Sequence, residues 1–86
     1  MKQIQPFSLW VNGQQVTATL FSLIIINDNL FNSAIFYWQL LDADSVKLQD
    51  GNLTMDEPDY DVWSSTQDIN QSAYDWAANK LNIILV

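Results

Sequence analysis

Residues 7–20 read FSLWVNGQQVTATL, and this stretch gives the clearest indication of the fold. Apolar residues recur at every second position on both sides of Asn12-Gly13, which is typical of two half-buried strands. Asn-Gly favours a two-residue type I′ turn, because both turn positions require a positive φ angle. Such a turn predicts a β-hairpin, which we expect within residues 3–26. The turn pairs residue 9 with 16 and residue 7 with 18, and places four apolar side chains on one face: Phe7, Leu9, Val16 and Ala18.

The end of this hairpin and the chain that follows predict a central strand, two more strands and a turn. Both faces of Leu20–Ile26 are apolar, which is typical of a central strand covered on both sides. A loop at Asn27-Asp28-Asn29 is followed by the β-branched and aromatic run Ala34–Leu41, which predicts a third strand. Asp42-Ala43-Asp44-Ser45 predicts a turn, and Val46–Met55 a fourth strand.

The fourth strand contains an irregularity in its alternation. Val46 and Leu48 are even-numbered, whereas Leu53 and Met55 are odd-numbered, so all four can share one face only if one residue is inserted between the pairs. We expect this insertion to be a β-bulge at Asp50-Gly51, with the glycine at positive φ.

Two helices are expected in the last third of the chain. The first is short, from Pro58 to about Ser64, because proline and acidic residues favour a first helical turn. It presents Tyr60 and Trp63 three residues apart. The second helix spans about Ile69 to Leu81, and Asn82 can end it in the left-handed conformation. Its apolar stripe consists of Ile69, Ala73, Trp76, Ala77 and Leu81.

The four aliphatic residues 83–86 predict a short strand that pairs within the chain, because such a segment invites aggregation when it is exposed. The sequence as a whole predicts one domain over residues 1–86. Its fold class is α+β, with an antiparallel sheet of four or five strands and with a short helix and a C-terminal helix packed on one face.

Three absent residue types limit the chemistry of this chain. Without cysteine there is no disulfide, thiolate nucleophile or cysteine-ligated metal. Without histidine the commonest general base and metal ligand is missing, and without arginine so is the bidentate phosphate clamp. We therefore expect a protein that is not an enzyme and that has no cofactor.

The net charge of −7 lies in the second half of the chain. Residues 42–86 hold nine of the ten carboxylates, whereas residues 1–41 hold only Lys2 and Asp28. Nucleic acids and anionic membranes both require a cationic surface, so we expect neither as a partner. The run Leu20–Ile26 is shorter than the roughly 20 residues of a membrane-spanning helix, and no signal peptide is recognisable. The sequence predicts a soluble protein.

Two groups of carboxylates resemble metal sites. Asp42-Ala43-Asp44-Ser45 is similar to the start of a calcium loop, but Lys47 and Leu53 stand where that loop requires glycine and glutamate. We interpret it as a hairpin turn in which an aspartate accepts backbone N–H groups. The other group allows three interpretations: a solvated helix start, a docking patch for a basic protein, or a weak Ca²⁺ or Mg²⁺ site. It consists of Asp56, Glu57, Asp59 and Asp61.

Trp10 is a further candidate for partner binding. The hairpin register places it on the face opposite Leu9, which should be the more open side, and tryptophan is enriched at interface hot spots. The other three tryptophans, Trp38, Trp63 and Trp76, are expected in the core.

Over about residues 34–86 the chain resembles small uncharacterised proteins found in tailed-bacteriophage genomes. Such relatives have glycine where this chain has Ser45 and Asn82. The resemblance implies a virion or assembly component, located in the virion or the host cytoplasm. The residues that carry it are Tyr37–Asp44, Gly51–Met55, Asp59-Tyr60, Trp63, Tyr74-Asp75-Trp76 and Lys80-Leu81.

The expected function is a non-enzymatic structural or assembly module of a bacteriophage particle, acting through sheet edges and apolar patches. Its partners would be other protein subunits, including ones with basic surfaces, or further copies of the chain in a homo-oligomer. The alternative is a small acidic inhibitor that mimics nucleic acid and blocks a host or defence protein. Such a mimic spreads its carboxylates along one long face, whereas seven of the nine in residues 42–86 fall within residues 42–61.

Overall fold

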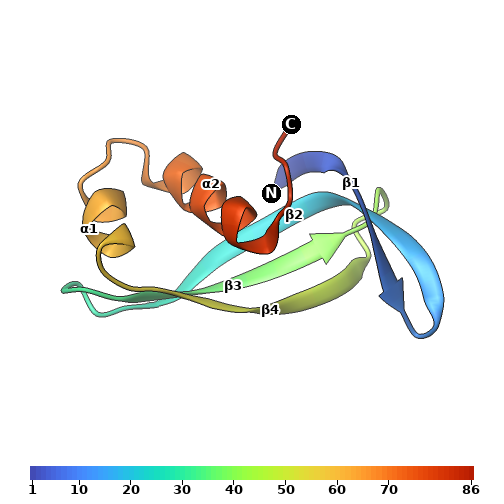
Figure 1. Ribbon diagram of the computed structural model, residues 1–86, viewed down its shortest axis with the longest axis horizontal. Coiled ribbons are helices and arrows are strands. Elements are labelled where there is room, and N and C mark those ends of the chain that lie inside the picture. Colours follow the sequence, from blue (N-terminus) through green and yellow to red (C-terminus); the bar gives the residue numbers. More distant parts are fainter.

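The computed structural model describes residues 1–86 and has an α+β fold. Its strands form one antiparallel sheet in the order β1-β2-β3-β4, and both helices lie on the same side of that sheet (Figure 1). The expected fold class is thus confirmed, with four strands in the sheet, a short helix and a C-terminal helix. The elements are β1 (Lys2–Val11), β2 (Gln14–Asp28), β3 (Ala34–Leu41), β4 (Lys47–Met55), α1 (Asp59–Ser64) and α2 (Ile69–Leu81).

The β1–β2 hairpin has the turn and the register that the sequence predicts. Asn12 and Gly13 both have positive φ angles, of 53° and 77°. Farther from the turn, Gln3 pairs with Leu20 and Phe7 with Ala18. Three residues of β1 therefore lie opposite the single residue Thr19, which makes a bulge in β1. The expected pairs are all present, namely Phe7 with Ala18, Leu9 with Val16, and Val11 with Gln14.

The second half of β2 overturns one expectation. β1 pairs with β2 only as far as Phe21, so β3 is the only strand beside residues 22–28. Ile24, Ile25 and Ile26 are 54%, 46% and 54% exposed. The expectation that Leu20–Ile26 is covered on both sides was therefore wrong for its second half. An apolar run is compatible both with a buried strand and with an exposed strand edge, and only the pairing distinguishes the two.

β4 has the predicted bulge, but at a different residue. Leu40 pairs with Gln49 and Leu41 with Lys47, so the extra residue is Leu48 and not Gly51. Gly51 pairs regularly with Trp38 and does not have a positive φ. Glycine is required at this position for another reason. A Cβ atom on residue 51 would lie only 2.9 Å from Cζ2 of Trp38, which is too close. The tryptophan ring thus occupies the space above the glycine.

Both helices are confirmed, and α1 begins at Asp59, one residue after the predicted start, with Pro58 as its N-cap. α1 buries Tyr60 and Trp63. α2 begins after Asp68, whose side chain accepts the backbone N–H of Gln71 as an N-cap (3.0 Å). It ends at Asn82, whose φ of 60° and ψ of 37° are left-handed. Neither helix has the length and apolar character that are needed to cross a membrane.

The C-terminal segment pairs within the chain, as expected, although through an isolated bridge and not a full strand. The two termini lie close together as a result (Figure 1). The contacts are a bridge between Ile4 and Leu85 and hydrogen bonds from Gln5 N to Ile84 O (2.8 Å) and from Val86 N to Gln3 O (3.1 Å).

One hydrophobic core lies between the sheet and the helices. Phe21 of β2 and Met55 of β4 are fully buried in it, and Phe21 meets Tyr74 of α2 edge to face, with ring centroids 5.5 Å apart. Trp63 is buried, and Trp38 and Trp76 are partly buried and pack against the core, as the sequence predicts.

Candidate protein-binding groove at the edge of the sheet

Residues 22–28 of β2 form a free strand edge, since no strand pairs with them on the side away from β3. Residues 22–27 contain no charged residue and no proline. Ile26 is an extra residue in the ladder, because Ile25 pairs with Phe36 and Asn27 with Ile35. An unpaired strand is a template for another chain, and soluble proteins commonly protect such an edge with lysine, proline or a bulge. Here the bulge is present, but lysine and proline are not.

One backbone position of this free edge is capped by a side chain. The Tyr74 hydroxyl accepts the backbone N–H of Leu23 (3.0 Å) and donates to the Leu23 carbonyl (3.4 Å). The backbone groups of Leu23 therefore point away from β3. Because these groups alternate along a strand, those of Ile25, two residues on, face the same open side.

A groove of about 350 Å³ lies between the free edge and the two helices, and we call it the edge groove. It has the size and mostly apolar lining of typical ligand-binding clefts. The sheet contributes Leu23, Ile25, Asp28 and Phe36 to its walls, and the helices contribute Trp63, Ile69, Asn70, Ala73 and Tyr74. Three of these nine side chains are aromatic and one is charged.

That charged side chain, Asp28, is held in a defined position. Its Oδ1 atom accepts the hydroxyl of Tyr60 (2.7 Å) and the backbone N–H of Leu30 (2.8 Å), whereas Oδ2 receives no hydrogen bond from the protein. Hydrogen bonding to Asp28 raises the pKa of the Tyr60 hydroxyl above its ordinary value of 10.0, and burial of the phenol adds to this effect. The phenol is therefore protonated at neutral pH and acts as a donor to Asp28.

Exposed apolar side chains are concentrated near the edge groove. The β2–β3 turn carries Leu30 and Phe31, which are 85% and 76% exposed, and Ile69 at the start of α2 is 48% exposed. The turn is held by the Asn29 side chain, whose Oδ1 accepts the backbone N–H groups of residues 31–33 at 2.9–3.0 Å. Ordered, solvent-exposed apolar groups beside an open strand mark a surface suited to contact with protein.

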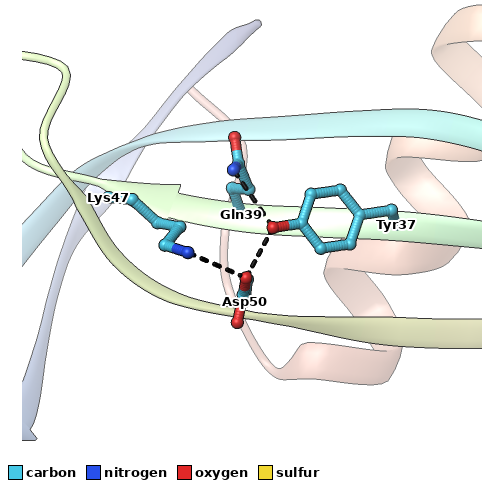
Figure 2. A network of polar contacts seen from close by, with 4 residues as sticks. All are labelled: Tyr37, Gln39, Lys47 and Asp50. Atoms are coloured by element: carbon cyan, nitrogen blue, oxygen red, sulfur yellow. Dashed lines mark hydrogen bonds and ion pairs between the residues drawn. The ribbon is translucent and has the colours of Figure 1, made fainter.

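The opposite face of the sheet carries a polar network instead (Figure 2). Asp50 of β4 accepts the hydroxyl of Tyr37 and the ammonium of Lys47 (3.1 Å), and Gln39 donates to the Tyr37 hydroxyl (3.2 Å). The hydrogen bond from Tyr37, and next to it that from Lys47, lowers the pKa of Asp50, while Asp50 raises the pKa of Lys47. Lys47 and Asp50 are exposed, so the network links β3 to β4 at the surface and forms no enclosed site.

The four carboxylates predicted as a patch lie along the entry to α1 and in its first turn. Asp59 accepts the indole N–H of Trp76 (3.0 Å), whereas Asp56, Glu57 and Asp61 are exposed. No three carboxylates of the protein lie together as a metal site would require. The Asp42 turn is confirmed as a hairpin turn, because Asp42 Oδ1 accepts the backbone N–H groups of residues 44 and 46 at 2.9 and 3.0 Å.

Trp10 is 74% exposed, as its position in the hairpin predicts. It lies near the β1–β2 turn, at the end of the molecule opposite α1 and the β2–β3 turn (Figure 1). It is therefore no part of the edge groove. Its role in partner binding stays a prediction.

The sequence did not reveal the edge groove. Its residues are far apart in the chain, and the only signal is the apolar run Leu20–Ile26, which predicts a covered strand. Comparisons with protein-family models, curated proteins and solved structures find no match to this chain.

Proposed function

We propose that this chain is a non-enzymatic binding module that joins other protein chains through the edge groove and the free edge of β2. The observation that carries the proposal is the combination, at one place, of unpaired strand backbone, half-exposed isoleucines and an apolar groove. A docked segment can bond to the backbone at Ile25 and place a side chain in the groove.

The docked segment is short, because two features limit the free edge. Tyr74 occupies the backbone groups of Leu23 at one end, and the bulge at Ile26 interrupts the ladder near the other. Main-chain bonding is thus confined to the neighbourhood of Ile25. Side-chain burial in the groove must supply most of the affinity, which favours a partner with a large anchoring side chain.

A place for this module in a bacteriophage particle rests on the resemblance of residues 34–86 to proteins of tailed-phage genomes. Several residues that carry the resemblance are core residues, such as Tyr60, Trp63 and Tyr74. They support a shared fold more directly than a shared partner. Assembly within the virion is therefore the context that we propose, and the edge groove is the surface that would serve it.

The acidic-mimic alternative receives no added support from the carboxylate positions. The side chains of Asp28, Asp42, Asp50, Asp59, Asp68 and Asp75 all accept hydrogen bonds from the chain itself. They cap turns and helices and link elements, which explains their placement without a nucleic-acid-like row.

A library of random peptides, selected on the folded protein, tests the binding module. We expect the selected peptides to lose binding to Ile25→Lys and to Ile69→Lys, which change two exposed positions of the groove. Val46→Lys is the matched control, because it makes the same change at an exposed apolar position outside the groove, and circular dichroism checks that each variant is folded. Peptides that bind Ile25→Lys and Ile69→Lys as well as the wild type, or the absence of any selected peptide, would refute the proposal.

A further inference from the structure

We infer that the edge groove takes a lysine or arginine side chain from an extended segment of a basic partner protein, with Asp28 as the counter-charge. The inference rests on the proposed binding function and specifies the partner. It follows from the lining of the groove, from the position of Asp28 and from the charge of the whole chain.

The lining suits the long stem of a basic side chain. Phe36, Trp63 and Tyr74 form aromatic walls, and Ile25 lies at the open side. Lysine and arginine bury their aliphatic stems on such surfaces while the charged head stays near a polar group. Aromatic faces also attract the cation itself.

Asp28 is the one charged residue in the lining. The Tyr60 hydroxyl and the Leu30 N–H both bind Oδ1, so the carboxylate is fixed while Oδ2 is free to accept a further donor. A carboxylate can accept about four hydrogen bonds, and those from a cation are stronger than those from neutral donors. A partner cation therefore meets an acceptor whose position is already set.

Two of the three lysines of the chain are already engaged and are not available to fill the groove of another copy. Lys2 donates to Gln71 (3.0 Å) and lies over the ring of Tyr74, and Lys47 is paired with Asp50 (3.1 Å). Only Lys80 has no side-chain partner, and the chain has no arginine. Two copies would also bring together net charges of −7 each. These charges favour a different, basic protein over a second copy.

The exposed carboxylates near α1 extend this complementarity. α1 contributes Trp63 to the groove wall, and Asp56, Glu57 and Asp61 lie at its start or in its first turn. A negative surface around an apolar groove attracts a basic segment and raises its association rate. The predicted acidic docking patch would thus guide the partner, while Asp28 holds its anchor.

The peptides selected on the groove test this inference separately from the binding function. We expect them to share a lysine or arginine flanked by apolar residues, and to weaken as salt rises from about 50 to about 500 mM. Asp28→Asn retains acceptors for Tyr60 and Leu30 but removes the charge. By isothermal titration it should weaken binding at least about tenfold, which corresponds to 1.4 kcal/mol.

Asp44→Asn is the control, because it removes the same charge from an exposed turn outside the groove and should change affinity less than about twofold. Equal losses in both variants would show long-range attraction only and overturn the inference. Groove-dependent peptides without a cation would overturn it while leaving the binding function intact. Sedimentation that shows a dimer broken by Ile25→Lys would make a second copy the occupant and also overturn it.

Discussion

At the scale of single residues, two tyrosine hydroxyls have different roles in the sheet. Tyr74 is buried, and its hydroxyl satisfies the backbone of Leu23 where no neighbouring strand does so. Tyr37 lies on the uncovered face, where its hydroxyl bonds to the exposed Asp50 (Figure 2). Removal of each oxygen therefore tests a different property of the protein.

Tyr74→Phe should lower the free energy of unfolding by about 1–3 kcal/mol, because the N–H of Leu23 would lose its partner in a buried setting. Urea denaturation followed by fluorescence measures the change. Tyr37→Phe is the matched control and should stay within about 0.5 kcal/mol of the wild type. If the stability loss in Tyr74→Phe is as small as that in Tyr37→Phe, the N–H of Leu23 must bond to water or to another acceptor in the variant.

Tyr37→Phe should instead raise the pKa of Asp50 toward its ordinary value of 3.8. The hydroxyl of Tyr37 donates to the carboxylate and favours its ionised form, so its loss makes protonation easier. Lys47→Met should also raise the pKa, because it removes both a hydrogen bond to the carboxylate and a positive charge beside it. NMR titration of the Asp50 carboxyl carbon measures both shifts. An unchanged pKa in Tyr37→Phe would show that the bond does not persist in solution.

At the scale of elements, the C-terminal segment contains one residue whose side chain is buried and a neighbour that contributes only its backbone. Ile83 is 6% exposed and Ile84 is 59% exposed, although the two residues are adjacent and identical. Ile84 contributes its carbonyl to the bond with Gln5, which does not depend on its side chain.

Ile83→Ala should therefore destabilise the protein by about 2–4 kcal/mol, and Ile84→Ala by less than about 1 kcal/mol. Deletion of residues 83–86 should unfold the monomer, since it removes both the buried side chain and the hydrogen bonds to β1. Thermal and chemical denaturation measure all three variants. A truncated protein that stays folded but no longer self-associates would make the segment an assembly arm.

The β4 bulge shows how far periodicity determines an element. The change from even to odd apolar positions requires an insertion somewhere between Leu48 and Leu53 or beside them, but parity does not locate it. The glycine at position 51 suggested one place, whereas the chain bulges at Leu48. Gly51 is explained by a side chain on the neighbouring strand, Trp38, which leaves no space for a Cβ atom.

At the scale of the whole molecule, the charge distribution predicts a partner class. Only three lysines face ten carboxylates, and two of the lysines are engaged within the chain. We therefore expect no binding to duplex DNA or RNA at physiological salt, because too few cations are available to displace counterions. A mobility-shift assay with a random duplex measures this, and salt-sensitive binding at micromolar concentration would contradict it.

The molecule is also elongated, with extents of 41 × 23 × 18 Å, and its two ends differ. The edge groove, α1 and the β2–β3 turn lie at one end, and Trp10 with the β1–β2 turn lies at the other (Figure 1). A module with unlike ends can contact two partners at once. Variants at Ile25 and Trp10 should accordingly affect binding independently.

Most elements of this protein can be predicted from local sequence patterns. The Asn12-Gly13 turn, the run Ala34–Leu41 and the helix Ile69–Leu81 all lie where periodicity and turn chemistry predict them, because these signals are local and repeat within a few residues. Which apolar residues are covered depends on long-range pairing, which local patterns do not specify. Ile24 to Ile26 look like core residues in the sequence, yet they lie at an edge because β1 pairs only as far as Phe21. The groove depends on the same long-range pairing, since it joins side chains from β2, β3, α1 and α2 that no local pattern relates.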